Sequence, residues 1–426
     1  MACDSERQQG GQSVGPNPRS QRNTASCHPC PKRKCHFRGW STRLGSSRRK
    51  CFPHMEKSGR PLNALLVTAF IWSRISIACI ALEPGDEMPR FHLPGVDGLL
   101  HDSAEFEKSN LLAVIFLSNH CPTSQMFQGR LIRLAKDYHL RGLTLVAISP
   151  NDPEAILPDE LAYSDLGDNI EEMAIRSKKL HYPFHYLYDG KTQETAKAFG
   201  ARVTPHAFLF DEFRKLRYTG RVGDPKNPTR EDREDLRLAI EALARGKNPP
   251  IARGRAFGSS IKWSKNRLIA EKMRERFSRE TVSLKHAEKR TLEFIRKNKA
   301  IWPKLIYVWS MEDKINRNNL LKLSNIHKIY RKRGLEWVTV CIDGDELKES
   351  AQQFLKDAQA SGRNFICSGS EIAPLADLRA EKGNRITPYF ALVEPAGKIA
   401  YRSTAGLDPL ELKRHILAVL DGISRR

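Results

Sequence analysis

The stretch "LLAVIFLSNHCPTSQ", residues 111–125, places a cysteine, Cys121, shortly after an uninterrupted apolar run. The run over 111–116 has the length and composition of a buried strand. The stretch that follows repeats apolar residues at helical spacing, namely Phe127, Leu131, Leu134 and Tyr138. We therefore expect Cys121 where a strand ends and a helix begins, either as a reactive thiol or as a small core residue.

The position of Cys121 favours reactivity. Free backbone N–H groups and the helix dipole stabilise an anion at a helix N-terminus, so the pKa of the thiol falls and the nucleophilic thiolate becomes populated. His120 adds a second source of positive charge next to the thiol.

From Leu82 to about 263, the chain alternates short β-branched or aromatic runs with amphipathic segments. The order strand, helix, strand, helix, two strands and a helix predicts a mixed sheet covered on both faces. Residues 300–426 repeat this plan. A gapless offset aligns Thr204 with Thr387 and Pro205 with Pro388, which indicates a domain duplication.

The remaining segments give the domain organisation. Residues 264–299 are highly charged and free of proline and glycine, so we expect a helical connector. Residues 1–54 lack apolar periodicity and carry 11 Lys/Arg against 2 Asp/Glu. We expect this tail to be disordered or untranslated. Its "CHPCPKRKCH" could hold zinc, but no second, well-spaced ligand pair accompanies it, and we predict no metal site.

Residues 55–81 have the order of a secretory signal peptide. Lys57 and Arg60 precede an apolar run, and small residues follow it. An uncleaved membrane anchor over residues 62–82 is the alternative, because that length can span a bilayer. Both interpretations export the chain, so we expect a periplasmic protein or one anchored to the membrane and facing the periplasm. A cytosolic protein in which this segment is a buried apolar helix is the remaining alternative.

The chain resembles the thioredoxin-fold superfamily. A strand that ends in a cysteine at a helix start, followed much later by "VTPHAFLFD", carries this resemblance. The leader "LEPGDEMPRFHLPGVDGLL", the Cys-Pro-Thr sequence and the closing "AFGSSIKW" make residues 82–263 similar to peroxiredoxin-like proteins of the alkyl hydroperoxide reductase and thiol-specific antioxidant branch. Residues 300–426 resemble a degenerate thioredoxin-like domain.

The resemblance implies an α/β fold with two tandem thioredoxin-like domains, each a mixed central sheet flanked by helices. It also implies that Thr204 and Pro205 line the substrate-binding site and that the peptide bond between them is cis. Ser118 lies three residues before Cys121, as the Thr or Ser of a peroxiredoxin active site does, so the resemblance adds Ser118 to Cys121 and His120 as the predicted catalytic residues. The relatives commonly have Cys-Asn-His-Cys where this chain has Ser118 as the first residue. They also commonly have Gly-Cys-Ser-Ile-Lys-Trp where this chain has Ser259 as the second residue. Both local partners of Cys121 are therefore serines.

The second half departs further from the pattern of an active dithiol. In "WSMED", Ser310 and Asp313 stand at the two redox positions, so dithiol chemistry is excluded there. Its cysteines, Cys341 and Cys367, end predicted strands, as buried core thiols commonly do. A disulfide between them is the alternative in an exported protein.

Two functions follow from these observations. The first is an exported one-cysteine thiol oxidoreductase in which Cys121 attacks a peroxide or a disulfide, with a thiol reductant or a disulfide-bearing protein as its partner and no cofactor. The second is a redox-inactive tandem peptide- or protein-binding protein in which Cys121 is a packed residue. Although the net charge is +22, about +9 lies in the tail and no aromatic-basic motif accompanies the rest, so we expect no nucleic-acid partner.

Overall fold

The computed structural model describes residues 81–226, 234–379, 387–404 and 406–424. The predicted tail over 1–54 and nearly all of the predicted signal peptide or anchor over 55–81 lie outside these residues. Within the described part of the chain, no helix is both long and apolar enough to cross a membrane.

The first sheet has five strands. In spatial order they are β5 (His185–Tyr188), β4 (Leu143–Ser149), β3 (Leu111–Phe116), β7 (His206–Phe210) and β8 (Leu216–Gly220). Strands β3, β4 and β5 are parallel, whereas β7 and β8 run antiparallel to their neighbours. This is the mixed sheet that the sequence predicts, and the apolar run over 111–116 is its central strand.

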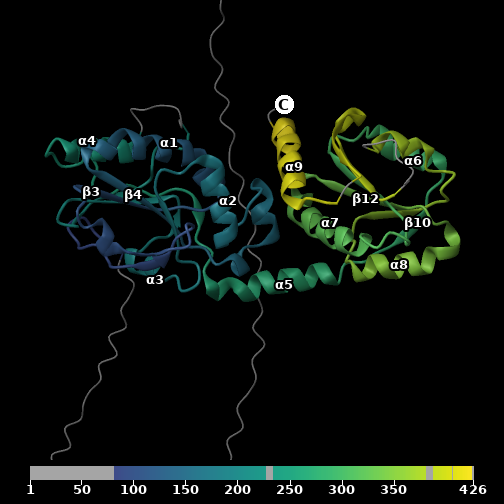
Figure 1. Ribbon diagram of the computed structural model, residues 1–426, viewed down its shortest axis with the longest axis horizontal. Helices are drawn as coiled ribbons and strands as arrows, with labels where there is room; N and C mark the ends of the chain where they lie inside the picture. The colour runs from purple at the N-terminus through teal and green to yellow at the C-terminus, as the bar shows by residue number, and fades with distance from the viewer. Residues whose placement is uncertain (1–80, 227–233, 380–386, 405, 425–426) are drawn as a thin grey trace, which may run out of the picture. The chain divides into compact units, whose positions relative to one another are not determined.

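Helices cover both faces of this sheet (Figure 1). They are α1 (Pro122–Tyr138), α2 (Ile170–Leu180), α3 (Glu194–Phe199) and α4 (Asp235–Ala244). Alternate residues of a strand point to opposite faces, and accordingly Ala113 and Ile115 pack with α1, α2 and α4, whereas Val114 and Phe116 pack with α3. The predicted apolar stripe of α1 is buried in the first of these two clusters.

Two short antiparallel strand pairs lie beside the first sheet. Strands β1 (His92–Pro94) and β2 (Leu100–Asp102) pair with each other, and so do β6 (Val203–Thr204) and β9 (Ser259–Ser260). The second pair matters for function, because it fixes residues 259 and 260 beside the loop that contains Pro205.

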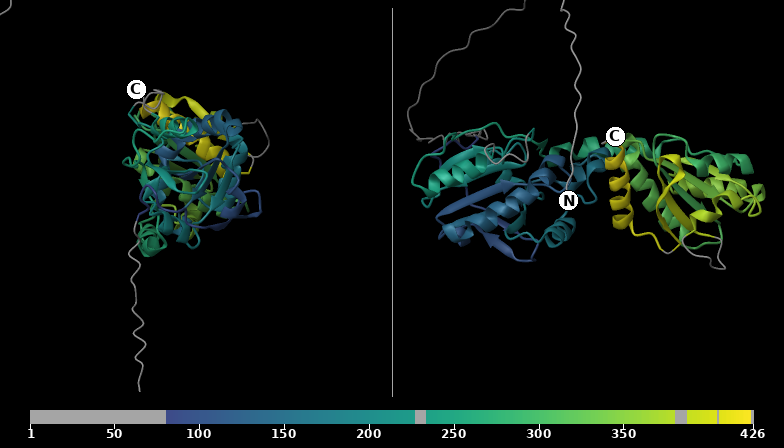
Figure 2. Two further views of the ribbon diagram at one scale, coloured as in Figure 1. Left: turned by 90° about the vertical axis from the view of Figure 1, so that its left-hand side faces the viewer. Right: turned by 90° about the horizontal axis from the view of Figure 1, so that it is seen from above.

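The second sheet has six strands. In spatial order they are β10 (Leu284–His286), β13 (Arg363–Ile366), β12 (Glu336–Cys341), β11 (Lys304–Trp309), β14 (Tyr389–Val393) and β15 (Ile399–Ser403). Apart from the additional β10, the chain order and strand directions match those of the first sheet. Its helices are α6 (Lys289–Lys297), α7 (Asn316–Tyr330), α8 (Lys348–Asp357) and α9 (Pro409–Ser424), and they also flank their sheet (Figure 2).

Two expectations differ from the structure. The helical connector over 264–299 is interrupted, because α5 (Arg267–Ser278) is followed by β10, which extends the second sheet, and then by α6. The alternative of a disulfide between Cys341 and Cys367 is wrong, since both thiols are free. Cys341 packs on the face covered by α7, α8 and α9, and Cys367 packs on the opposite face with α6. Both are core thiols, as the first interpretation has it.

Candidate active site

Cys121 is the N-cap of α1, directly after the loop that leaves β3. Pro122 occupies the first turn of the helix, where its missing N–H leaves no hydrogen bond unmade. The Sγ atom accepts a hydrogen bond from the backbone N–H of Ser124 at 3.4 Å. Cys121 is 0% exposed, so the thiol sits at the helix N-terminus, as the sequence predicts, but is enclosed by its neighbours.

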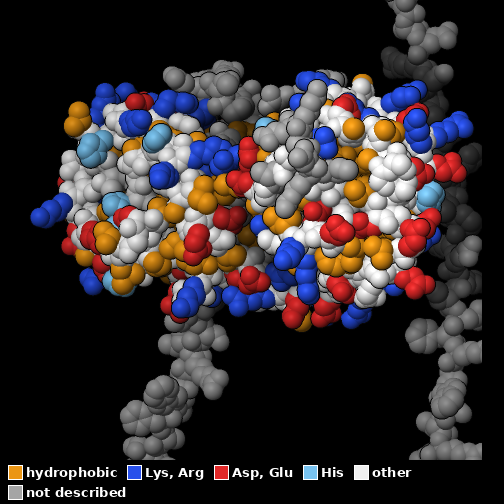
Figure 3. Space-filling model, turned by 45° about the vertical axis from the view of Figure 1, so that its right-hand side comes forward, with side chains coloured by type: hydrophobic (Ala, Val, Ile, Leu, Met, Phe, Trp, Pro, Cys, Tyr) orange, Lys and Arg blue, Asp and Glu red, His pale blue; other side chains and the backbone are white. Residues whose placement is uncertain are grey.

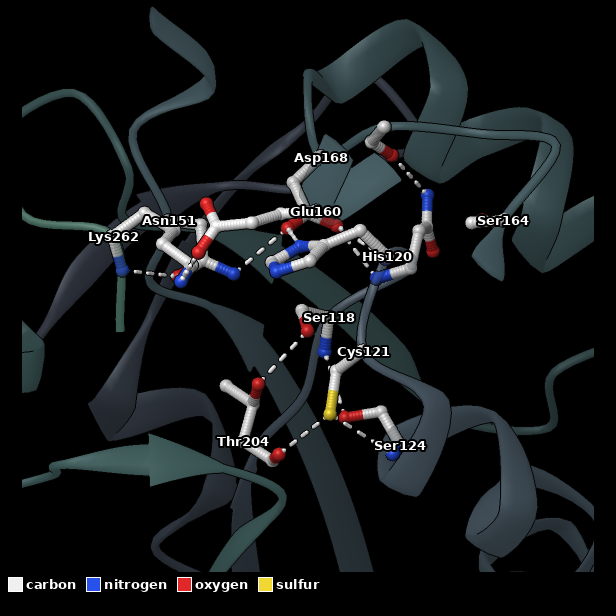
Figure 4. Close-up of polar contacts among 12 residues, drawn as sticks. Ser118, His120, Cys121, Ser124, Asn151, Glu160, Ser164, Asp168, Thr204 and Lys262 are labelled. Carbon is white, nitrogen blue, oxygen red and sulfur yellow. Dashed lines mark hydrogen bonds and ion pairs between the residues drawn. The ribbon is translucent and has the colours of Figure 1, made fainter. Parts of the chain in front are cut away.

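The loop before Pro205 forms one wall around the thiol (Figure 4). The S–H of Cys121 donates to the carbonyl oxygen of Thr204 at 2.9 Å. The Ser118 and Thr204 hydroxyl groups lie 2.8 Å apart and share a hydrogen bond. The Thr204–Pro205 peptide bond is cis, which confirms the expectation, and the Thr387–Pro388 bond is cis as well. Thus the structure brings Ser118 and Thr204 together beside Cys121.

Ser259 is the other neighbour of the sulfur. It pairs with Thr204 across the β6–β9 ladder. Burial raises the pKa of the Cys121 thiol, but hydrogen bonds from Ser259 and Ser124 outweigh burial and hold that pKa below its ordinary value. The site therefore lowers the pKa of the thiol even though it excludes solvent.

His120 points away from the loop of Thr204 and bonds to Asp168 (Figure 4). Its Nδ1 lies 2.5 Å from Oδ2 of Asp168, and both side chains are buried. Burial lowers the pKa of His120, yet the charge and the hydrogen bond of Asp168 outweigh it, so the pKa lies above its ordinary value. The other ring nitrogen, Nε2, is buried and has no hydrogen-bond partner among the described residues.

Asp168 is the centre of a polar network. Besides the His120 ring, its carboxylate accepts the backbone N–H of Asn119 at 2.6 Å and the side-chain N–H of Asn151 at 2.7 Å. Burial raises the pKa of Asp168, but the nearby His120 and these donors bring it below its ordinary value. The network therefore holds an anion in the interior and fixes the loop between β3 and α1.

A second layer connects this network to the segment after β9. The backbone N–H of Lys262 donates to Oδ1 of Asn151 at 2.8 Å. The Lys262 ammonium lies 2.5 Å from a carboxylate oxygen of Glu160. The chain around Ser259 is thus held in place from both sides, by β6 and by Asn151.

The equivalent position in the second half contains no thiol. Ser310 and Asp313 stand at the end of β11, as predicted, and the Ser310 hydroxyl donates to Asp343 at 2.6 Å. The carboxylate of Asp343 also accepts the backbone N–H of Met311 at 2.6 Å. Cys341 donates to Asp343 at 3.2 Å, and burial raises its pKa, so this thiol is neutral and part of the core.

Sequence reasoning missed Asp168, Asn151 and Ser124. Ser124 had a sequence signal, because the third residue of a helix commonly donates its N–H to the N-cap side chain. Asp168 had none, since it lies 48 residues from His120 along the chain. Among the described residues, a group with metal-ligand chemistry occurs on other elements, at Asp97, His101 and His185.

Comparison with known proteins gives a family match in the first half of the chain. Residues 83–237 match the family model described as Redoxin. The chain belongs to the thioredoxin-fold superfamily, with a peroxiredoxin-like first half. Redoxin homologues are thiol oxidoreductases and act on thiols or disulfides.

Solved structures of bacterial proteins align with the chain. A hypothetical protein from Sinorhizobium meliloti 1021 is 35% identical, with 43% of this chain and 97% of that chain covered and a TM-score of 0.38. An uncharacterized conserved protein from Geobacillus kaustophilus is 36% identical, with 43% and 93% covered and a TM-score of 0.39. A putative thiol:disulfide interchange protein DsbE from Chlorobium tepidum is 19% identical, with 38% and 99% covered and a TM-score of 0.31. No curated protein matches the chain.

Proposed function

We propose that the protein is an exported one-cysteine thiol oxidoreductase with Cys121 as its nucleophile. The observation that carries the proposal is the set of hydrogen bonds from Ser124 and Ser259 to the buried sulfur at the start of α1. These donors stabilise the thiolate, which is the reactive form in attack on a peroxide or a disulfide. Cys121 is the only cysteine between Leu82 and Ala300, so no second thiol in that region competes for this role.

With a peroxide as substrate, the thiolate attacks one oxygen of the O–O bond. An S–O bond forms, the O–O bond breaks, and its electron pair leaves with the second oxygen, which takes a proton and departs as an alcohol or water. Cys121 becomes a sulfenic acid and the peroxide is reduced. A small peroxide suits a thiol with no exposed surface better than a protein disulfide does, because it needs a smaller opening.

The neighbouring residues divide the remaining tasks. The Ser118 hydroxyl and the Thr204 carbonyl are polar groups that lie beside the sulfur. Pro205 follows Thr204 in the same wall of the site. Asp168 raises the pKa of the buried His120 ring, whose Nε2 has no hydrogen-bond partner in the part of the chain that the structure describes. The His120 ring adds positive charge near the thiolate, and Asp168 acts as a positioning residue that holds the ring.

Completion of the cycle requires an external thiol. Neither Ser118 nor Ser259 can form a disulfide with oxidised Cys121. A thiol reductant therefore attacks the sulfenic acid, which releases water and leaves a mixed disulfide. A second thiol then attacks the reductant's sulfur and frees Cys121.

We also propose the domain organisation and the location. Residues 82–263 form the active domain. Residues 264–299 connect it to the second half and add β10 and α6 to that half. Residues 300–426 form a degenerate thioredoxin-like domain that binds or positions a partner. The matching strand order of the two sheets supports the duplication. The leader over 55–81, a signal peptide or an anchor through residues 62–82, supports a periplasmic protein or one that faces the periplasm from the membrane. Terminal sequencing of the exported protein tests this part.

A nucleic-acid partner has no support on the surface shown in Figure 3. Lys and Arg side chains on that face are interspersed with Asp and Glu. A continuous basic patch, which would be the footprint of phosphate binding, is not seen there.

A second candidate function is supported by the enclosure of Cys121. A thiol with 0% exposure and no dithiol partner fits a redox-inactive protein that binds a peptide or protein beside Pro205 and Pro388. In that case Cys121 is only a packed residue.

The experiment that separates the two candidates is a Cys121→Ser substitution in the full chain. The oxidoreductase proposal expects peroxide consumption and disulfide reduction to be lost, whereas Cys341→Ser and Cys367→Ser keep the first chemical step. Dimedone should trap a sulfenic acid at Cys121 of the wild type after peroxide treatment. A thiol that stays free through long oxidant exposure, and is alkylated only after unfolding, supports the binding protein instead.

A further inference from the structure

A second group of chemically competent side chains lies where the β1–β2 hairpin meets β5, the edge strand of the first sheet. Asp97 belongs to the turn of the hairpin, His101 lies on β2 and His185 begins β5. One ligand atom from each residue lies within 4.8 Å of the other two. The hairpin is fixed to the strand by a backbone hydrogen bond from Val96 to the Tyr186 carbonyl at 3.0 Å, so the three side chains are brought together by rigid elements.

His101 is held between two carboxylates. Its Nδ1 lies 3.0 Å from Oε2 of Glu105, and its Nε2 lies 2.9 Å from Oδ2 of Asp97. The ring is nearly buried, with 6% of the side chain exposed, whereas both carboxylates are partly exposed. A histidine that donates one ring N–H to a carboxylate and presents the other nitrogen to a metal is the usual arrangement around protein-bound zinc.

His185 supplies the third nitrogen. Its ring centroid lies 4.6 Å from that of His101 and 5.5 Å from that of Phe106. The His185 side chain has no hydrogen-bond partner among the residues that the structure describes.

We propose that Asp97, His101 and His185 form a binding site for a divalent transition metal ion, with Zn²⁺ as the best match to two imidazoles and one carboxylate. Ligand bonds of about 2.0 Å at a tetrahedral angle separate two ligand atoms by roughly 3.3 Å, and the Asp97–His101 pair at 2.9 Å is close to that separation. The ion takes the place of the proton that Nε2 of His101 shares with Asp97, and that proton is released to solvent. Glu105 keeps the Nδ1–H and fixes the ring.

Three protein ligands leave a fourth coordination position for water. A cavity of about 590 Å³ is lined by Asp97, Glu105 and His185, among other residues, so this position is accessible. The ion would tie the hairpin to the edge strand. The site is independent of the proposed chemistry of Cys121, and it departs from the expectation of no metal that the sequence alone supports.

The test is titration of the full chain with ZnCl₂ and, separately, with CoCl₂. Thiols also bind these ions, so the background carries Cys121→Ser and serine at each cysteine that precedes Leu82: Cys3, Cys27, Cys30, Cys35, Cys51 and Cys79. We expect one equivalent of Zn²⁺ to bind by calorimetry and Co²⁺ to give the visible spectrum of a four-coordinate ion. Since even outer partners change metal affinity by about 10–100-fold, Glu105→Gln should weaken binding to that extent. His101→Ala and His185→Ala should each weaken it further.

His92→Ala is the matched control. His92 lies on the same hairpin and contacts Asp102 at 3.2 Å, but no third ligand accompanies this pair, so binding should remain unchanged. His185 is exposed, so its substitution is not expected to unfold the protein, and the melting temperature of each variant checks this. Zn²⁺ should raise the melting temperature of the background protein and not that of His185→Ala. Absence of stoichiometric binding, or equal binding by His185→Ala, overturns the proposal.

Discussion

The Oδ2 atom of Asp168 lies 2.5 Å from Nδ1 of His120, the residue immediately before Cys121. Both side chains are buried, and a buried charge is stable only when it is paired and hydrogen-bonded. Asp168 therefore does two things at once. It raises the pKa of the His120 ring. It also anchors the backbone of the loop that leads to Cys121 at the start of α1, through the N–H groups of Asn119 and His120.

The first prediction concerns the pH dependence of stability. The pKa of Asp168 is lowered in the folded state, so its contribution is present above the unfolded pKa and is lost as the pH falls through the folded one. The pKa of His120 is raised, so its contribution is present below the unfolded pKa and is lost as the pH rises through the folded one. With unfolded pKa values of about 3.9 and 6.5, both contributions are complete between about pH 4 and pH 6.5.

Asp168→Asn should therefore lower the free energy of unfolding most within that window. Removing one partner of a buried pair costs about 3–5 kcal/mol. Chemical denaturation at a series of pH values measures the difference from wild type. Asp137→Asn is the control, because Asp137 is half-exposed and contacts Arg237 only at 3.5 Å. A difference between wild type and Asp168→Asn that is constant from acidic to alkaline pH would contradict the assignment.

The second prediction concerns Ser259. Hydrogen bonds from Ser259 lower the pKa of Cys121 because they stabilise the thiolate. Ser259→Ala should therefore raise that pKa, read as the midpoint of the pH dependence of alkylation by iodoacetamide.

Ser260→Ala is the matched control for Ser259→Ala. Ser260 is the next residue on β9 but is exposed and pairs with Val203. Its substitution should leave the midpoint in place. Equal midpoints for the two variants would mean that Ser259 does not stabilise the thiolate.

The third prediction separates the three described thiols. Burial raises the pKa of Cys367 to about 12 and raises that of Cys341 as well, so neither should react with iodoacetamide at neutral pH in the folded protein. Cys121 should be the first of the three to be labelled. After unfolding without reductant, peptide mapping should find label on both core cysteines. Failure to label them in that step would mean that a disulfide joins them.

Local pattern was enough to predict β3, α1 and the placement of Cys121, because strand and helix periodicity depend on neighbouring residues. The contacts between distant segments were not accessible in this way. Helix α1 and strand β4 lie between His120 and Asp168 along the chain, so their hydrogen bond joins segments that are distant in sequence. The separation of Cys341 from Cys367 depends on register, since Cys341 pairs with Ile366 and the next residue points to the other face. Strand β10 has only three residues, and its pairing with β13 defines it.

The last prediction follows from the two contacts that Thr204 makes. Its hydroxyl lies 2.8 Å from the Ser118 hydroxyl, and its carbonyl accepts the Cys121 thiol at 2.9 Å. Ser118→Cys therefore places a second thiol on the same wall and recreates the Cys-x-x-Cys spacing, which permits a local disulfide.

Peroxide treatment of Ser118→Cys should give an intramolecular disulfide, detected as the loss of two hydrogens by intact mass, and thioredoxin-type reductants should then support repeated turnover. The wild type should instead accumulate a sulfenic acid or a mixed disulfide at Cys121. Ser260→Cys is the control, because it adds an exposed cysteine on β9 without a described contact to Cys121. If oxidised Ser118→Cys shows the same adducts as wild type and no disulfide between residues 118 and 121, the sulfenic acid does not form within reach of Ser118, and the proposed geometry of oxidation is incorrect.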